Sequence, residues 1–202
     1  MKRAFFFIDG FNFYHSIDYR CFYRFKWLNY YKLVSILKKA DDEIRKVLFF
    51  TAYAEWDQSK IVRHKILIKA LESERVETIL GRFKYKDTWC RNCNYYYKQH
   101  IEKQTDVNIA VNLLKFAVKN EFDRAYIISG DTDLIPAIRV FKELCPQKEV
   151  CIVFPFSRKG EELKTVCDYH IKIKVRHLSA CILPDPYVLN DGTQLHCPPS
   201  WK

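Results

Sequence analysis

The sequence predicts an α/β fold in which helices flank a central, mainly parallel sheet. Continuous apolar runs alternate along the chain with stretches of helical periodicity. Such runs are typical of strands buried on both faces, and their alternation with helices favours right-handed parallel crossovers. A third observation is that acidic residues follow two of the runs, Asp9 directly and Asp131 after Ser129 and Gly130. A chain of 202 residues with 49% hydrophobic residues is sufficient for one domain with a substantial core.

Six strands are expected from apolar or alternating segments. They lie at 4–8, 47–53, 77–85, 125–129, 149–154 and 171–173. At the end of the third strand, Arg82, Lys84 and Lys86 alternate with aromatic residues and should share one face.

Helices are expected in most of the connections. The first begins near Asn12, where Gly10 permits a sharp exit from the first strand, and a second ends near Lys39. Further helices are expected at 58–74, 102–120, 134–144 and 160–167. Residues 87–99 interrupt the pattern and predict a loop or insertion. The domain should span residues 1–182, and the proline-containing segment 183–202 predicts an extended tail packed on it, with Trp201 as an anchor.

The net charge of +10 favours a polyanionic partner, and nucleic acid is the leading candidate. The simpler alternative is a basic surface without a dedicated ligand. Eight cysteines are dispersed over the chain, the apolar run at 4–8 is too short for a secretion signal, and no run reaches membrane-spanning length. We therefore expect a cytoplasmic protein with reduced thiols and no membrane association.

Four aspartates predict a divalent-metal site. Asp9, Asp131 and Asp133 follow expected strands, whose carboxyl ends share one edge of a parallel sheet. Asp106 lies on the apolar side of the helix expected at 102–120, where an uncompensated carboxylate is costly. Four acids at one edge would repel one another without a cation. Hard oxygen ligands without a histidine cluster favour Mg²⁺ or Mn²⁺, one ion or two.

Structural roles could also explain each acid alone. Asp133 or Thr132 could cap the following helix, Asp9 could fix the turn at Gly10, and Asp106 could accept from basic or backbone donors. The chain contains neither a mononucleotide P-loop nor a dinucleotide-binding glycine motif. It also lacks an Asp-x-Asp pair after the first strand, which argues against a haloacid-dehalogenase-type phosphotransfer site.

Cys90 and Cys93 have the spacing of half a zinc site, with His100 as the only nearby third ligand. A fourth ligand would have to come from elsewhere in the chain. Zn²⁺ is therefore less favoured than Mg²⁺ or Mn²⁺. A redox role is less favoured still, because the pair does not open a helix after a strand.

Three ordered motifs resemble the successive signatures of NYN domains in the LabA-like branch, relatives of PIN-domain nucleases. They occupy residues 7–13, 102–107 and 129–134, and two tail pieces at 183–185 and 198–201 are similar as well. The resemblance implies a Rossmann-like sheet of order 3-2-1-4-5 and metal-dependent cleavage of RNA. It implies metal ligands at Asp9, Asp106, Asp131 and Asp133, with Asn12 beside them and Ser129 and Glu102 as helpers.

Together these observations predict a metal-dependent endoribonuclease that cleaves RNA phosphodiesters with an activated water. Two surfaces are candidates for holding RNA: the row Arg82, Lys84 and Lys86, and the aromatic and basic segment 19–31 with Arg20, Arg24 and Lys26. Aromatic segments more often pack in a core. A non-catalytic RNA-binding or regulatory module is the alternative function. The sequence leaves open a homodimer or a regulatory protein partner.

Overall fold

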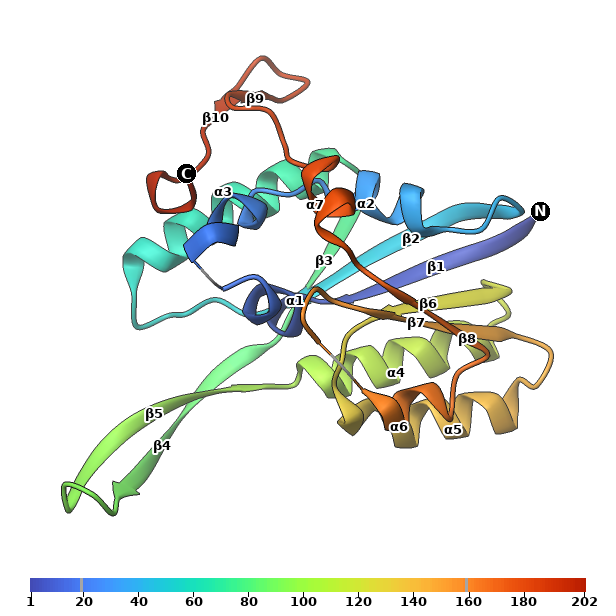
Figure 1. Ribbon diagram of the computed structural model, residues 1–202, viewed down its shortest axis with the longest axis horizontal. Coiled ribbons are helices and arrows are strands. Elements are labelled where there is room, and N and C mark those ends of the chain that lie inside the picture. Colours follow the sequence, from blue (N-terminus) through green and yellow to red (C-terminus); the bar gives the residue numbers. More distant parts are fainter. Residues whose placement is uncertain (19, 159) are drawn as a thin grey trace.

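The computed structural model describes residues 1–18, 20–158 and 160–202. Six strands form a parallel sheet in the order β3-β2-β1-β6-β7-β8 (Figure 1). They are β1 (Lys2–Asp9), β2 (Asp42–Thr51), β3 (Val76–Leu80), β6 (Arg124–Ile128), β7 (Glu149–Phe154) and β8 (Tyr169–Lys172). The first five strands follow the expected order 3-2-1-4-5. The sheet differs from that expectation by the sixth strand, β8, which pairs with β7 at the edge.

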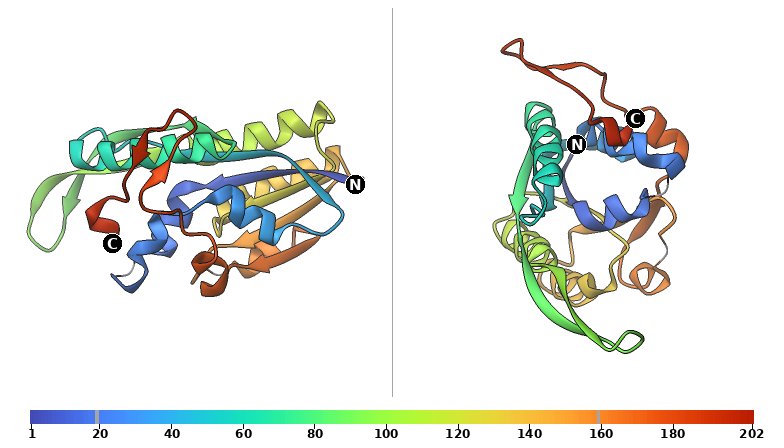
Figure 2. Two further views of the ribbon diagram at one scale, coloured as in Figure 1. Left: turned by 90° about the horizontal axis from the view of Figure 1, so that it is seen from above. Right: turned by 90° about the vertical axis from the view of Figure 1, so that its left-hand side faces the viewer.

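Helices cover both faces of the sheet (Figures 1 and 2). They are α1 (Gly10–Ser16), α2 (Tyr30–Leu37), α3 (Gln58–Ser73), α4 (Thr105–Val118), α5 (Ile135–Leu144), α6 (Glu161–Lys164) and α7 (Val175–Ser179). Short 3-10 turns are η1 (Arg20–Lys26), η2 (Thr132–Leu134) and η3 (Pro199–Trp201). In β1, Phe6 and Ile8 pack with α1, α2 and α3, whereas Phe5 and Phe7 pack with α4 and α5. Strand β1 is thus central to both halves of the core.

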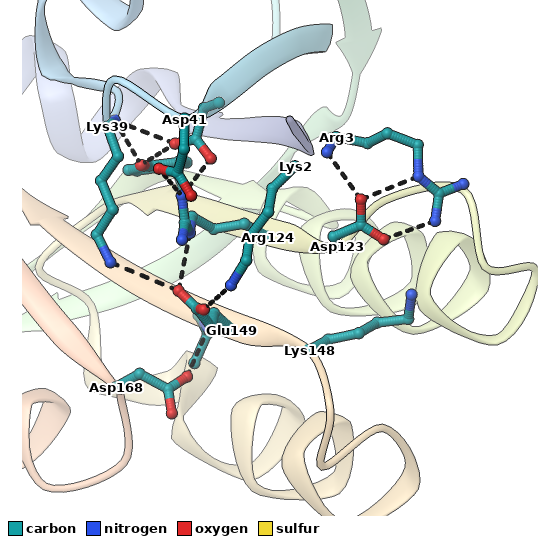
Figure 3. A network of polar contacts seen from close by, with 12 residues as sticks. Lys2, Arg3, Lys39, Asp41, Asp123, Arg124, Lys148, Glu149 and Asp168 are labelled. Atoms are coloured by element: carbon teal, nitrogen blue, oxygen red, sulfur yellow. Dashed lines mark hydrogen bonds and ion pairs between the residues drawn. The ribbon is translucent and has the colours of Figure 1, made fainter.

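A network of ion pairs occupies the edge formed by the amino ends of the strands (Figure 3). The buried Arg124 donates to Glu149 at 2.8 Å and to Asp41 at 3.1 Å, and it also pairs with the buried Asp42. Lys2 adds a second cation to Glu149. A buried guanidinium requires such partners, because an isolated charge in the interior is costly.

The chain leaves the sheet after β3 and forms an antiparallel hairpin, β4 (Arg82–Cys90) and β5 (Tyr95–Lys103). Figure 1 shows this hairpin projecting away from the sheet. The third strand therefore ends at Leu80 and not at Tyr85, and residues 87–99, where a loop or insertion was expected, form the outer part of an inserted hairpin. The chain leaves the sheet at Gly81. An added Cβ there would lie 2.8 Å from the carbonyl oxygen of Lys103, so only glycine allows the two chain segments to approach this closely at the base of the hairpin. The alternating basic and aromatic residues after Gly81 therefore belong to the hairpin and not to the central sheet.

Helix α4 begins at Thr105, three residues later than predicted. Glu102 is the penultimate residue of β5, and its carboxylate accepts from the backbone N–H of Thr105 at 3.2 Å. It thereby satisfies one of the free N–H groups at the start of the helix. Gln104, with a left-handed backbone (φ 81°), makes the turn between strand and helix.

The C-terminal segment packs on the domain through a short antiparallel pair, β9 (Tyr187–Val188) and β10 (Gln194–Leu195), and through η3. Trp201 is 6% exposed and joins the core cluster on the α1–α3 face. The indole of Trp27 donates to the carbonyl of Pro184 at 3.0 Å. Among the described residues, no helix combines the length and apolarity needed to cross a bilayer.

Candidate active site

Three carboxylates from three different elements meet at the carboxyl ends of the central strands. Asp9 ends β1, Asp131 follows β6, and Asp106 lies in the first turn of α4. One oxygen atom from each lies within 4.8 Å of those of the other two. Adjacent β1 and β6 bring the first two acids together, and the crossover helix supplies the third. Open α/β sheets bind ligands at this edge.

The carboxylate of Asp9 is held by two donors. Its Oδ1 accepts from the backbone N–H of Asn12 at 2.9 Å and so caps α1. Its Oδ2 accepts from the hydroxyl of Ser129 at 2.8 Å, and that hydroxyl accepts from the N–H of Asp131 at 3.0 Å. Asn12 Oδ1 accepts from the N–H of Gly130 at 3.0 Å. Ser129 and Asn12 therefore fix the positions of the acids relative to one another.

Asp133 takes a more peripheral position than the other three acids. It is exposed and lies outside the group of three close carboxylates. Its backbone N–H donates to Asp131 Oδ1 at 3.0 Å, in the η2 turn that Asp131 caps. Asp131 and Asp133 are two residues apart in the sequence but differ in position. Asp131 is an inner carboxylate, within the group of three, and Asp133 is an outer one.

Burial and mutual repulsion raise the pKa values of the inner acids. The pKa of Asp9 rises to about 6, chiefly because the group is buried, and the charges of Asp131 and Glu102 add to the shift. The pKa of Asp106 also rises to about 6, through burial and then the charges of Asp9, Asp131 and Asp133. The pKa of Glu102 is raised as well, mainly by burial. The arrangement is electrostatically unfavourable for anions alone, which is a property expected of a cation site.

A cavity of about 720 Å³ opens beside the acids, between α1, α3 and the base of the hairpin. Gly10, the neighbour of Asp9, and Glu102 line this cavity, but none of the three clustered aspartates does. At Gly10 an added Cβ would come within 2.6 Å of the carbonyl oxygen of Phe50, so α1 can approach β2 only through glycine. The cavity is rich in rings, contributed by Phe11, Tyr14, Tyr30, Trp56, Phe83, His100 and Trp201. Lys26, Lys60 and Arg63 add cationic groups.

The predicted RNA-contacting residues fall into two groups. Arg82, Lys84 and Lys86 are exposed and lie on one face of β4, as the alternation indicated. Lys26, in contrast, is 6% exposed and pairs with Asp18 at 2.5 Å. This lysine is a buried structural cation, and the expectation that it contacts phosphate on an open surface was wrong.

The segment 19–31 is mainly a packing element. Phe25, Trp27 and Tyr30 are buried in the core cluster, so they are not free to stack on bases. Arg24 is exposed and lies over the ring of Phe25. Tyr19 lies outside the described residues, and Arg20 is described for its backbone only.

The hairpin does not bring His100 to the two candidate zinc-ligating cysteines. Cys90 pairs in register with Tyr95 near the tip, whereas His100 pairs with Tyr85 toward the base. His100 instead stacks on Trp56, with ring centroids 3.6 Å apart. Among the described residues, only the aspartate group has metal-ligand geometry. The structure therefore does not bring together Cys90, Cys93 and His100, the ligands of the less favoured zinc alternative.

Two residues near the site were missed by the sequence analysis. The side chain of Arg158, in the loop after β7, lies 3.1 Å from the position of a Cβ at Gly130. Trp56 follows β2 and walls the cavity. Both lie beyond carboxyl ends of parallel strands, so the rule that selected the aspartates would have found them.

Comparison with known proteins gives two similar chains. A 6-hydroxy-3-succinoylpyridine 3-monooxygenase, HspA, from Pseudomonas putida is 26% identical over 157 residues, which cover 69% of this chain and 50% of that enzyme. The chain thus spans half the length of this curated relative. A crystal structure of a Vibrio parahaemolyticus protein of unknown function matches with a TM-score of 0.58 and 18% identity, over 86% of this chain and 93% of that one.

The second match shows that the fold occurs in another solved structure. The family assignment comes from a match of residues 3–174 to the NYN domain. This span includes the whole sheet except the first residue of β1, and it includes the three clustered aspartates. The protein belongs to the NYN domain family.

Proposed function

We propose that the protein is a metal-dependent endoribonuclease whose catalytic centre is formed by Asp9, Asp106 and Asp131. The observation that carries the proposal is the convergence of these three carboxylates within 4.8 Å at the carboxyl edge of a NYN-domain sheet. Three like charges at this separation repel unless a cation or protons intervene. The basic character of the chain, with a net charge of +10, suits RNA as the substrate.

The residues present fit Mg²⁺ or Mn²⁺ better than a softer metal. All three groups offer hard oxygen atoms, and no His or Cys belongs to the cluster. Asp9, Asp106 and Asp131 would hold the ion, with Asp133 as an outer carboxylate. When bound, such an ion lowers the pKa of a water and offsets negative charge on a phosphodiester.

The other residues at the site would act by positioning and by charge. The hydroxyl of Ser129 and the N–H of Asn12 hold both oxygens of Asp9 in place before substrate arrives. Asn12 also holds the Gly130 backbone, next to Arg158. An exposed guanidinium in that loop is suited to a phosphate of the bound strand. Arg82, Lys84 and Lys86 supply further cations along β4.

A second candidate function is binding of RNA without cleavage. The observation in its favour is that Asp9 and Asp131 already cap α1 and η2 with their side chains. Both acids therefore stabilise helix ends even when no metal is bound. A module of this kind would bind RNA equally well in the presence of EDTA.

The test is cleavage of single-stranded and structured RNA in Mg²⁺ or Mn²⁺. We expect Asp131→Asn to lower the cleavage rate at least about 100-fold, because each lost carboxylate weakens the cation site. Asp191→Asn, which changes an exposed acid in the C-terminal segment, is the matched control and should cleave normally. Equal activity of wild type and Asp131→Asn would refute the ribonuclease proposal and leave the binding module.

A further inference from the structure

Five rings lie on one face of the hairpin, in one group toward its base and one toward its tip. Strand alternation and the register of β4 with β5 place Phe83, Tyr85, Trp89, Tyr96 and His100 on the same side of the ribbon. We call this set the aromatic track. The track continues to Glu102, which pairs with Phe83 on the same face and lies at the start of α4. It therefore leads from the hairpin tip to the candidate active site.

Neighbouring rings on this face contact one another. The centroids of Tyr85 and His100 are 4.8 Å apart, as are those of Trp89 and Tyr96. At the base, Trp56 stacks on His100 and meets Phe83 at 4.6 Å, which joins the track to the cavity. The Nδ1 atom of His100 is buried and has no hydrogen-bond partner within the described part of the chain.

The rings toward the tip are open to solvent. Tyr85 is 64% exposed, Trp89 46% and Tyr96 63%. Large exposed rings in a row are unusual for a surface without a partner. The same face contains no Val, Leu or Ile, which an apolar protein or lipid contact would favour, and the charged pair Asp87 and Lys98 lies on it between the two groups of rings. Within residues 82–103 there are six Lys or Arg residues against two acids, so the ribbon suits an anionic partner.

We propose that the aromatic track binds single-stranded RNA by base stacking and guides the strand into the candidate active site. The proposal rests on the proposed ribonuclease function and specifies its substrate as unpaired RNA. Stacking requires bases that are splayed out of a duplex, and every base offers a π face, so the track would be tolerant of sequence. Lys98, on the same face as the track, would contact a phosphate, whereas Arg82, Lys84 and Lys86 lie on the opposite face and would attract the strand through their charge. The cavity at the base would receive the base next to the cleaved bond.

The hairpin offers a matched control on its opposite face. Tyr95 and Tyr97 alternate with Tyr96, pair with Cys90 and Thr88, and are also exposed, at 72% and 48%. The double variant Trp89→Ser with Tyr96→Ser removes two rings from the track. The double variant Tyr95→Ser with Tyr97→Ser removes two rings from the other face of the same ribbon. Neither pair belongs to the core clusters, so both proteins should fold.

The experiment measures binding of a labelled oligoadenylate of about twelve nucleotides in EDTA, by fluorescence anisotropy. We expect the track variant to bind at least about 30-fold more weakly than wild type, since each stacked base contributes about fivefold or more. The control variant should bind within about threefold of wild type. The same strand paired with its complement should bind wild type more weakly than the free strand.

Several results would overturn the proposal. Equal losses in the two variants would show that no stacking face is used, and unchanged binding in both would show that RNA does not contact the tip. Duplex RNA bound as tightly as single strands would exclude base stacking. If wild type bound anionic lipid vesicles and the track variant alone did not, the face would be assigned to a membrane. If wild type formed a dimer in solution and the track variant alone did not, the face would be assigned to a second copy. Because binding is measured without metal, a track that binds RNA would stand even if no cleavage were found.

Discussion

At the scale of single residues, the inner acids disfavour the folded protein when they are ionised. Burial raises the pKa of Asp106 and of Asp9 to about 6, above the ordinary aspartate value of 3.8. A group whose pKa is raised by folding binds protons more tightly in the folded state, so its unfavourable contribution appears as pH rises from about 4 through 6. The role proposed for these acids therefore requires a charge that opposes the stability of the fold.

We expect Asp106→Asn to stabilise the metal-free protein at pH 7, by on the order of 1 kcal/mol after allowance for solvent screening. The amide removes the charge without changing the shape of the side chain. Urea unfolding in EDTA measures this difference. At pH 4, where the wild-type carboxyl is mostly protonated in the folded state, the two proteins should differ little. A less stable Asp106→Asn protein at pH 7 would show that the acid is structurally compensated.

At the scale of elements, the hairpin is attached to the domain but contributes little to its core. The two core clusters contain no buried residue from β4 or β5. The connection at Gly81 and at Glu102 nevertheless places its base against α4 and the inner acids. The ribbon therefore depends on the domain for its position, whereas the domain does not depend on the ribbon's tip.

Joining Lys86 to Gln99 through an Asn-Gly turn would remove residues 87–98 while retaining the register of the base, because these two residues pair across the ribbon. We expect the free energy of unfolding to change by less than about 1 kcal/mol, as for surface changes away from the core. Urea denaturation checks this. A loss of several kcal/mol would show that the tip contacts the domain in solution.

The hairpin also shows where sequence patterns were insufficient. Residues 82–85 alternate like the end of a sheet strand, and Gly81 signals a bend without revealing that the chain leaves the sheet there. Lys26 is typical of a surface by residue type, yet a partner eight residues away, Asp18, makes its burial favourable. By contrast, the parallel strands and the strand-end acids could be predicted, because strong local hydrophobic patterns determine both. Tertiary pairing cannot be deduced from such patterns.

At the scale of the whole molecule, the two edges of the sheet have opposite electrostatics. Opposite charges pair around Arg124 at the amino edge (Figure 3). Like charges gather at the carboxyl edge. Hydrogen bonds from Arg124 and Lys2 lower the pKa of Glu149 from 4.5 to about 2. A carboxyl group with a lowered pKa stabilises the fold above its ordinary pKa, and this contribution is lost as pH falls toward 2.

We expect the free energy of unfolding to fall as pH is lowered from about 4.5 to about 2, and Glu149→Gln to reduce that dependence. The glutamine has no charge to lose over this interval. Asp123, whose pKa is lowered to about 2 by its bonds to Arg3, still contributes part of the dependence of unfolding free energy on pH. Urea titrations at a series of pH values measure the effect. Identical acid dependence in the two proteins would exclude Glu149 as a contributor.

The hairpin's independence from the core has a consequence for how this protein can change over evolutionary time. Substitutions among residues 87–98 meet no packing constraint from the sheet or its helices, whereas Asp9, Asp131 and their donors each affect a cap or a strand end. Under the proposed function, mutations at the tip would alter which strands are captured without disturbing the inner acids. Substrate choice and the proposed chemistry would then occupy separable segments of one chain, and selection would act on each alone.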